Sequence, residues 1–384
     1  MPGPGSYWMG IEEMESVIEV MKSGHLFRYG DINDPKFLHK TSTLESEFAD
    51  YCGVPFALAT SSGTSSLICS LIALGLKPGD EIIVSAYTFV ATYSACIFAG
   101  LIPVLAEIDE SLTLDPEDIE HRITGRTKAI LPVHMLGNPC DMDRIMAVAK
   151  KHGLFVIEDC CQAVGATYKG KKVGAIGDIG AFSLNVFKTI NSGDGGLVVT
   201  SDQILYETAF GVHDQGHKPN RFGVEVGTRS ILGLNFRANE MTSAVALAQL
   251  KKLPKIVLTL REKKASLMAK ISGIGGFKFR KLNDPQGDAA TLCTLIFDTK
   301  EQAIKVSQAL GSKTIVQSGW HVYSNMEHVL NHLKKIGRPH TKGSYPKTDD
   351  ILSRSMNISI GVVDGGLGAG WGININSTDP EIEK

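Results

Sequence analysis

A lysine stands between two candidate strands in the stretch GAFSLNVFKTINSGDGGLVVT, residues 180–200. Lys188 follows a strand that ends at Ser183, and the glycine-rich turn GDGG (193–196) leads into the next strand. An amine that forms a Schiff base must be partly deprotonated, which burial or a neighbouring cation can bring about. A solvent-facing loop lysine is the commoner case. The stretch alone therefore allows either a Schiff-base lysine or an ordinary surface lysine.

An aspartate closes another apolar run in FVIEDCCQAVGA, residues 155–166. If a pyridine-type cofactor binds nearby, the carboxylate of Asp159 would keep the ring nitrogen protonated, which makes the ring an electron sink. Gln162, three residues further on, could donate to a phenolic oxygen of the same ring. Without a cofactor, Asp159 is a loop or helix-capping residue.

Two more stretches could complete a ligand site. In ATSSGTSSL (59–67), Gly63 and Thr64 lead from a strand into a helix, where N–H groups and the helix dipole favour a phosphate. Ser183 could add a hydroxyl there, although an ordinary Ser/Thr N-cap explains the pattern as well. In SAYTFVATYSA, Phe89 could stack on a heteroaromatic ring, worth about 0.5–1.5 kcal/mol beyond its burial, or could be a core residue.

The elements that must position these residues are short apolar strands alternating with helices. The expected strands are 81–85, 104–108, 129–133, 154–158, 181–184 and 196–200, and the expected helices between them include 65–76 and 141–153. Unbroken apolar strands that alternate with helices predict an α/β fold, with a mostly parallel central sheet and helices on both faces. Ligands bind such sheets at the carboxyl ends of the strands.

The pattern changes after residue 200. Residues 239–272 predict one long helix, or two helices broken at Pro254. Strands at 277–281 and 294–298 and a helix at 300–310 indicate a smaller α+β domain. The prediction is a large ligand-binding domain over 1–250 and a small C-terminal domain over 251–384.

The composition limits the classes of partner that the protein could bind. The chain has 384 residues, 43% of them hydrophobic, and a formal net charge of −2. No basic run suggests nucleic acid, and no apolar run is long enough to span a membrane. The N-terminus lacks a signal-peptide pattern, and the seven cysteines form no metal-binding or disulfide framework, so we expect a cytoplasmic protein without a metal site.

Taken together, the chain resembles the DegT/DnrJ/EryC1/StrS family of sugar aminotransferases. The matching segments occur in the family's order: SSGTSSL, SAYTFVAT, PVHMLG, VIEDCCQAVGA, FSLNVFKTINSGDGG and GLNFRANEMTSAVALAQL. The resemblance implies the aspartate aminotransferase fold (fold type I) and pyridoxal 5'-phosphate as cofactor. It also implies transfer of an amino group from glutamate to a keto-sugar.

The resemblance carries roles residue by residue. Lys188 matches the Schiff-base lysine and proton shuttle, and Asp159 matches the partner of the pyridine nitrogen. Gln162 matches the neighbour of the phenolic oxygen. Gly63, Thr64 and Ser183 match phosphate ligands, and Phe89 matches the stacking aromatic. Asn235 matches a residue that reaches the phosphate of the neighbouring subunit, which implies a homodimer with shared active sites.

Six further residues are candidates for binding the two substrates. Arg28 and Arg237 are the candidate clamps for a donor carboxylate, although a structural salt bridge explains Arg237 equally well. The candidate lining of the acceptor pocket is His213, His217, His321 and Tyr323.

The acceptor itself is left open. The closest branch of the family includes the enzyme that makes 8-amino-3,8-dideoxy-octulosonate, and a nucleotide-linked keto-deoxysugar is the other acceptor considered. The rival functions are a sugar dehydratase, a branch in which histidine replaces the lysine, and a non-catalytic binding protein.

Overall fold

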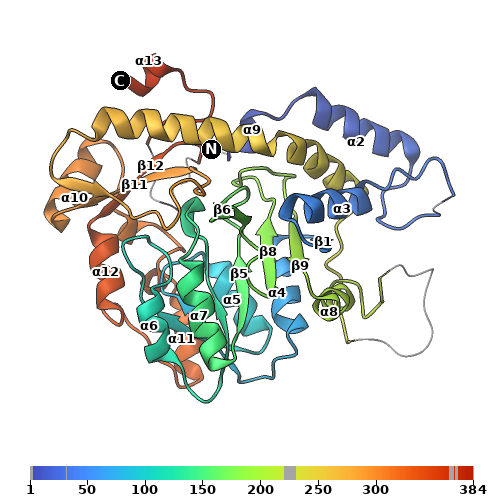
Figure 1. Ribbon diagram of the computed structural model, residues 1–384, viewed down its shortest axis with the longest axis horizontal. Coiled ribbons are helices and arrows are strands. Elements are labelled where there is room, and N and C mark those ends of the chain that lie inside the picture. The colour runs from blue at the N-terminus through green and yellow to red at the C-terminus, as the bar shows by residue number, and fades with distance from the viewer. Residues whose placement is uncertain (1–2, 32, 220–230, 363–366, 368–370, 384) are drawn as a thin grey trace.

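A seven-stranded sheet forms the centre of the computed structural model, which describes residues 3–31, 33–219, 231–362, 367 and 371–383 (Figure 1). The strands lie in the order β1-β9-β8-β5-β4-β2-β3. Their bounds are β1 Phe56–Thr60, β2 Glu81–Ser85, β3 Ile102–Ala106, β4 Thr127–Leu131, β5 Phe155–Asp159, β8 Ile179–Ser183 and β9 Gly196–Thr200. Strand β9 pairs antiparallel with both neighbours, whereas the other pairs in this sheet are parallel. The predicted mostly parallel sheet is confirmed.

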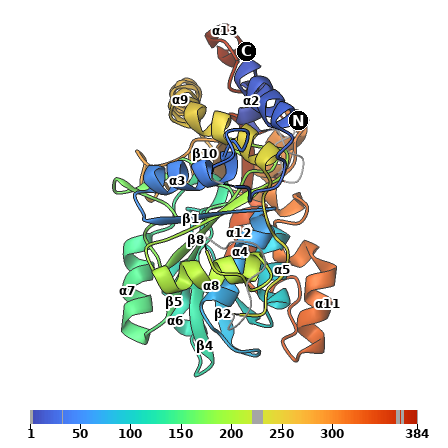
Figure 2. The same cartoon turned by 90° about the vertical axis from the view of Figure 1, so that its right-hand side faces the viewer.

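Side chains alternate between the two faces of the sheet, as the pleat requires. On β2, Ile82 and Val84 belong to one core cluster, while Ile83 belongs to another. One face is covered by α4 Gly63–Ala73, α5 Val90–Phe98 and α8 Gln203–His213, and the other by α3 Lys40–Cys52, α6 Pro116–Arg122 and α7 Met142–His152 (Figure 2). The sheet is therefore buried on both sides, which explains its unbroken apolar strands.

Most predicted elements of this region lie within two residues of their expected bounds. The helix expected at 65–76 ends three residues earlier, at Ala73, and the strand expected at 104–108 lies two residues earlier, as β3 at 102–106. Its parallel partner β2 fixes this range, because Glu81 pairs with Ile102 and Ser85 with Ala106. The sequence of one strand does not show where its partner begins and ends, so it cannot give the bounds that the pairing sets.

A single helix, α9 (Glu240–Ile271), runs along one end of the molecule. Pro254 lies inside it and does not divide it, so the one-helix alternative is confirmed. The N-terminal helices α1 (Pro4–Tyr7) and α2 (Ile11–Ser23) and the C-terminal helix α13 (Asp379–Glu383) contact α9 (Figures 1 and 2). The predicted domain boundary at residue 250 falls within α9 and stays a prediction.

A second, antiparallel sheet lies in the C-terminal part, in the order β10-β11-β12. Its strands are β10 Phe277–Phe279, β11 Leu292–Phe297 and β12 Ser355–Ser359, accompanied by α10 Lys300–Ala309, α11 Glu327–Lys335 and α12 Pro346–Ser353. Strand β12 was not predicted, because its polar residues obscure the pattern. In the fold, buried Asn357 accepts a hydrogen bond from Thr294 Oγ1 at 2.7 Å, which makes a polar strand tolerable in a core.

The small hairpin of β6 Thr167–Tyr168 and β7 Lys171–Lys172 completes the strands of the described residues. Among those residues, no helix has both the length and the apolar character needed to cross a bilayer.

Candidate active site

Two connected hollows open at the carboxyl edge of the central sheet. The larger has an empty volume of ≈ 700 Å³ and the smaller one of ≈ 590 Å³, with the open solvent at their mouths included. Both are lined by Phe89, Cys161, Gln162, Asn185 and Lys188. Residues from the ends of β2, β5 and β8 meet here because parallel strands bring their carboxyl ends to one edge.

Asp159, the last residue of β5, presents a buried carboxylate to the smaller hollow. Its Oδ2 accepts a hydrogen bond from Thr92 Oγ1 at 2.9 Å, and its Oδ1 accepts one from the Cys161 amide at 3.0 Å. Thr92 in turn contacts Thr88 Oγ1 at 2.8 Å. These bonds fix the carboxylate in place, so it can pair with a protonated ring nitrogen without rearranging.

Lys188 lies half-buried in the loop between β8 and β9 and lines both hollows. Backbone hydrogen bonds pin the loop: Leu184 N donates to Gly195 O at 2.8 Å, and Val186 N donates to Gly193 O at 3.0 Å. Gly193 and Gly195 have φ of 85° and 148°, a backbone region that favours glycine. The glycine-rich turn thus shapes the lysine loop.

The N-terminus of α4 forms the cradle for an anion. Ser62 caps the helix by accepting from the Ser65 amide at 3.1 Å, and Gly63 and Thr64 open the first turn. A Cβ on Gly63 would lie 2.6 Å from Ser183 Cβ, so only glycine permits β8 to approach the helix this closely. Thr64, Gly63 and Ser183 all line the smaller hollow.

Gln162 and Phe89 flank the space between the hollows. Gln162 Oε1 accepts a hydrogen bond from the Leu136 amide at 3.2 Å, which leaves the side-chain NH₂ as the donating end of the amide. Phe89 is 41% exposed, and its ring lies 5.1 Å from that of His321, which lines the larger hollow. An aromatic this exposed is available to stack on a ligand and is not a plain core residue.

The two arginine candidates lie elsewhere. Buried Arg28 pairs with Glu45, Nη2 to Oε1 at 2.9 Å, and Arg237 Nη1 pairs with Asp214 Oδ1 at 2.6 Å. Neither guanidinium lines the two hollows of this chain. Both pairings support the structural alternative raised for Arg237 and extend it to Arg28.

Of the pocket candidates His213, His217, His321 and Tyr323, the structure brings only His321 to the hollows. His213 is buried, with Nδ1 2.6 Å from Phe210 O and Nε2 2.9 Å from Arg28 Nη1. Burial, reinforced by the Arg28 charge, lowers the pKa of His213 to about 3. Tyr323 is also buried and donates to Asp349 Oδ2 at 2.9 Å. His217 is buried and outside the lining of both hollows.

Asn235 lies on the surface, away from both hollows of its own chain. Asn235 lies in the segment that precedes α9, and its backbone forms an isolated antiparallel β-bridge with that of Asp214. The nearby Leu232 and Leu234 are 95% and 56% exposed.

The prediction from sequence missed several lining residues. Thr92 was hidden because its role requires a contact with Asp159 across 67 positions; its place one helical turn after Thr88 was the available signal. The larger hollow also takes apolar residues from the C-terminal region: Leu292, Val362 and Leu367. No local pattern marks these.

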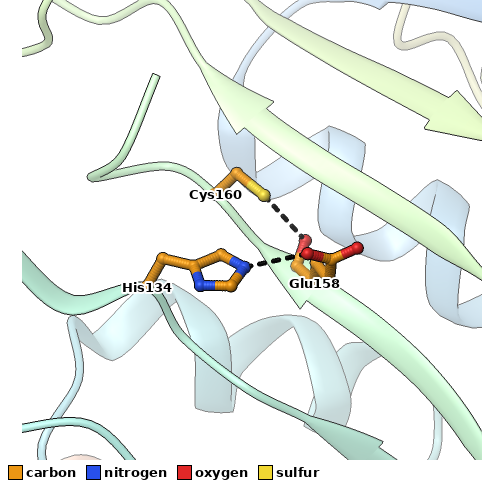
Figure 3. Close-up of side chains that lie close together, drawn as sticks. All are labelled: His134, Glu158 and Cys160. Atoms are coloured by element: carbon orange, nitrogen blue, oxygen red, sulfur yellow. Dashed lines mark hydrogen bonds and ion pairs between the residues drawn. The ribbon is translucent and has the colours of Figure 1, made fainter. Parts of the chain in front are cut away.

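Glu158 and Cys160 flank Asp159 in the chain, and together with His134 they form a buried group (Figure 3). Glu158 points away from the pocket, since neighbouring residues of a strand face opposite sides. Its carboxylate accepts from the Gly174, Ile176 and Gly177 amides and lies 3.0 Å from His134 Nε2. The other ring nitrogen, Nδ1, accepts from the Cys140 amide at 3.0 Å. Because both imidazole nitrogens of His134 have hydrogen-bond partners, this group stabilises the carboxyl end of β5 and has a structural role.

A parallel sheet that presents a lysine, a buried aspartate and a helix N-terminus around one pocket is the arrangement of a pyridoxal-phosphate enzyme. The model of the DegT/DnrJ/EryC1/StrS aminotransferase family matches residues 9–363, and the chain belongs to that family. Members of this family use pyridoxal 5'-phosphate. The predicted family, fold and cofactor are confirmed.

Individual relatives carry related names. GDP-perosamine synthase of Caulobacter vibrioides is 44% identical over 213 residues, covering 54% of this chain and 56% of that protein. SpsC, a spore coat polysaccharide biosynthesis protein of Bacillus subtilis, is 31% identical over 92% of this chain and 90% of its own length. A solved aminotransferase from Psychrobacter cryohalolentis superimposes with a TM-score of 0.81 at 28% identity, covering 100% of this chain and 96% of that one. The alignments with three GDP-perosamine synthases span only 56%, 59% and 62% of those proteins.

The residues of the pocket fit the cofactor. A buried acceptor with fixed hydrogen bonds (Asp159) suits a protonated ring nitrogen, and the first turn of α4 suits a phosphate. Lys188 supplies the amine that would hold the aldehyde carbon. The part of the chain that the structure describes thus offers a partner for each polar end of the molecule.

Proposed function

We propose that this protein is a pyridoxal-phosphate-dependent aminotransferase that moves an amino group from glutamate to a keto-sugar. The observation that carries the proposal is the placement of Lys188, Asp159 and the α4 N-terminus around one pair of connected hollows. These residues come from three separate segments of the chain. A non-catalytic binding protein could hold the cofactor on the same lysine, but its colour would not bleach when glutamate is added.

Each residue has a distinct task. When bound, the cofactor supplies an electron sink that stabilises negative charge on the substrate carbon. Asp159 would keep the ring nitrogen protonated, and Gln162 would donate to the phenolic oxygen. Gly63, Thr64 and Ser183 would hold the phosphate, while Phe89 would stack on the ring. Lys188 would hold the cofactor through Nζ, and the same amine, when free, would take the proton from the amino-bearing carbon of the donor.

The keto-sugar acceptor is supported by the names of the relatives, which include a GDP-perosamine synthase and a UDP-N-acetyl-3-dehydro-glucosamine 3-aminotransferase. Two acceptors stay open, an 8-keto-octulosonate and a nucleotide-linked keto-deoxysugar. His321 is the candidate acceptor contact, because it lines the larger hollow beside Phe89. A screen of both keto-sugar classes against the aminated holoenzyme, with product detected by mass, would decide between them.

Dehydration of the sugar is the alternative reaction, and the resemblance associates it with a histidine in place of the lysine. The lysine at position 188 supports amino transfer. Incubating the holoenzyme with ¹⁵N-glutamate and a keto-sugar separates the two reactions, because only a transferase places ¹⁵N in the sugar.

A homodimer with shared active sites is the proposed assembly. Asn235 and the exposed Leu232 and Leu234 form a surface segment that could face a second copy. In this arrangement Asn235 would complete the phosphate site of the partner. The seven free cysteines suit a reducing compartment, which supports the cytoplasm as the location.

The direct test is the attachment point of the cofactor. Borohydride reduction of the holoenzyme, followed by peptide mapping, should find the cofactor on Lys188, and Lys188→Ala should abolish transfer of ¹⁵N. Lys169→Ala is the control, because that lysine is exposed and pairs with Asp143 on the surface. Attachment at another residue, or full turnover by Lys188→Ala, would refute the proposal.

A further inference from the structure

Gln162 can donate to the cofactor only if its amide is held the right way round, and the bond that does this comes from an unusual turn. The turn is the 3-10 helix η1, Met135–Gly137, in which Leu136 has φ 56° and ψ 35°. A left-handed backbone is unfavourable for a branched side chain and persists only where surrounding contacts impose it. This conformation lets the Leu136 amide donate to Gln162 Oε1.

The contacts that impose the turn come from a buried arginine of the C-terminal region. Arg280, just after β10, is 4% exposed and donates from Nη1 to Met135 O at 3.1 Å and from Nη2 to Leu136 O at 2.8 Å. A single guanidinium group therefore donates hydrogen bonds to two consecutive backbone carbonyls. Thr291 Oγ1 adds a bond to Leu136 O at 3.4 Å, and the Ala289 amide donates to Gly137 O at 3.0 Å.

Arg280 is itself held in place by the carboxylate of Asp288. Asp288 Oδ1 lies 3.6 Å from Arg280 Nη2, while Asp288 Oδ2 pairs with buried Lys264 of α9. The guanidinium does not line either hollow, so it has no place for direct contact with a ligand there. Its effect on the pocket must pass through the turn.

We infer that Arg280 is a positioning residue for the cofactor, acting through the left-handed Leu136 to aim the Gln162 NH₂ at the phenolic oxygen. This inference rests on the proposed function. A donor at that oxygen favours its deprotonated form and lowers the pH at which the bound cofactor changes protonation state. Loss of the Arg280 fork should therefore raise that pH.

The test is a pH titration of the visible absorption of the bound cofactor. Gln162→Ala should raise the midpoint by about 1 pH unit. Arg280→Met and Arg280→Lys should raise it in the same direction, because lysine keeps the charge beside Asp288 but lacks the two-pronged geometry. Lys278→Met is the matched control, because Lys278 lies on β10 but is exposed and pairs with Glu110, and its midpoint should equal that of the wild type.

The double variant Gln162→Ala/Arg280→Lys should show no shift beyond that of Gln162→Ala, since both changes remove one interaction. A purely structural arginine would lower the melting temperature and leave the midpoint alone, and that result would overturn the inference. So would additive shifts in the double variant. If the wild-type protein binds no cofactor, the proposed function fails instead, so the two failures are distinguishable.

Discussion

At the scale of single residues, the site depends on hydrogen bonds that hold charged groups before any ligand arrives. Asp159 illustrates this, because Thr92 and the Cys161 amide each satisfy one carboxylate oxygen. A hydrogen bond to a charged group contributes about 1.5–3 kcal/mol. The aspartate is thus fixed by a hydroxyl on α5 and by a backbone amide just after β5.

Thr92→Val removes one of these bonds with little change in volume. We expect kcat/KM to fall by about 10- to 100-fold, because the carboxylate would lose part of its orientation and of its stabilisation as an anion. Thr208→Val is the control, since Thr208 Oγ1 donates to Ile204 O within α8, outside the lining of both hollows. Steady-state kinetics at saturating donor would measure both. Equal activity in Thr92→Val and wild type would show that the bond is dispensable.

His213 makes the stability depend on pH. Its pKa is lowered to about 3, first by burial and then by Arg28, whereas in the unfolded chain it lies near 6.5. The unfolded state therefore binds more protons below about pH 6.5, and the folded protein loses stability as the pH falls towards 3. Above pH 6.5 the residue is neutral in both states and contributes no slope.

Between about pH 7.5 and pH 5, His213 by itself should lower the free energy of unfolding of the wild type by on the order of 2 kcal/mol. His213→Gln, which keeps an acceptor for Arg28, should lose correspondingly less over that interval. Urea unfolding of the cofactor-free protein at both pH values provides the measurement. His121→Gln is the control, because that side chain is 80% exposed; a His213→Gln slope as steep as wild type would contradict the assignment.

At the scale of elements, the close approach of α4 to β8 builds the anion cradle. Replacing an exposed helical glycine by alanine ordinarily stabilises a protein by about 0.5–1 kcal/mol. At Gly63 the added carbon would instead meet Ser183 Cβ at 2.6 Å, and such overpacking costs about 1–3 kcal/mol. Steric conflict therefore outweighs helix propensity.

Gly63→Ala should consequently weaken cofactor binding by separating the helix from Ser183. Titration of the cofactor-free protein with pyridoxal 5'-phosphate, followed by absorbance, would show a raised Kd. Gly125→Ala is the control, since a Cβ at that loop position meets nothing within 4 Å. Unchanged affinity in Gly63→Ala would mean that the phosphate lies elsewhere.

At the scale of the whole molecule, the proposed shared sites predict that two impaired variants can complement each other in a mixed dimer. Lys188→Ala and Asn235→Ala homodimers should each be impaired. In a mixed dimer, one site would combine the intact Lys188 of one subunit with the intact Asn235 of the other. Co-refolding the two variants should therefore restore about a quarter of wild-type activity, given random pairing and one functional site in each mixed dimer.

Activity after mixing is the measurement, and mixing Lys188→Ala with Asp159→Ala is the control. Lys188 and Asp159 line the same hollow of one chain, so that mixture should stay inactive. If Lys188→Ala and Asn235→Ala also fail to complement, Asn235 does not act across the interface.

The sequence was most informative where position along the chain implies position in space. Asp159 ends β5, while Lys188 and Gly63 come shortly after β8 and β1, and the carboxyl ends of these strands meet at one edge of the mostly parallel sheet. The alternation of apolar strands with helices therefore determined both the fold class and the neighbourhood of the chemistry. The family resemblance added the roles.

Tertiary structure alone decided which polar residues serve the pocket and which serve the fold. Arg28 and Arg237 are held in ion pairs, while Thr92 and Arg280, which no motif marks, support Asp159 and Gln162. Arg280 meets Leu136 across 144 positions, and that contact exists only because the segment after β10 lies against the η1 turn in the folded chain. Local patterns encode which face of an element is buried. They do not encode which distant side chain will fill the space opposite, because packing of the assembled elements selects that partner.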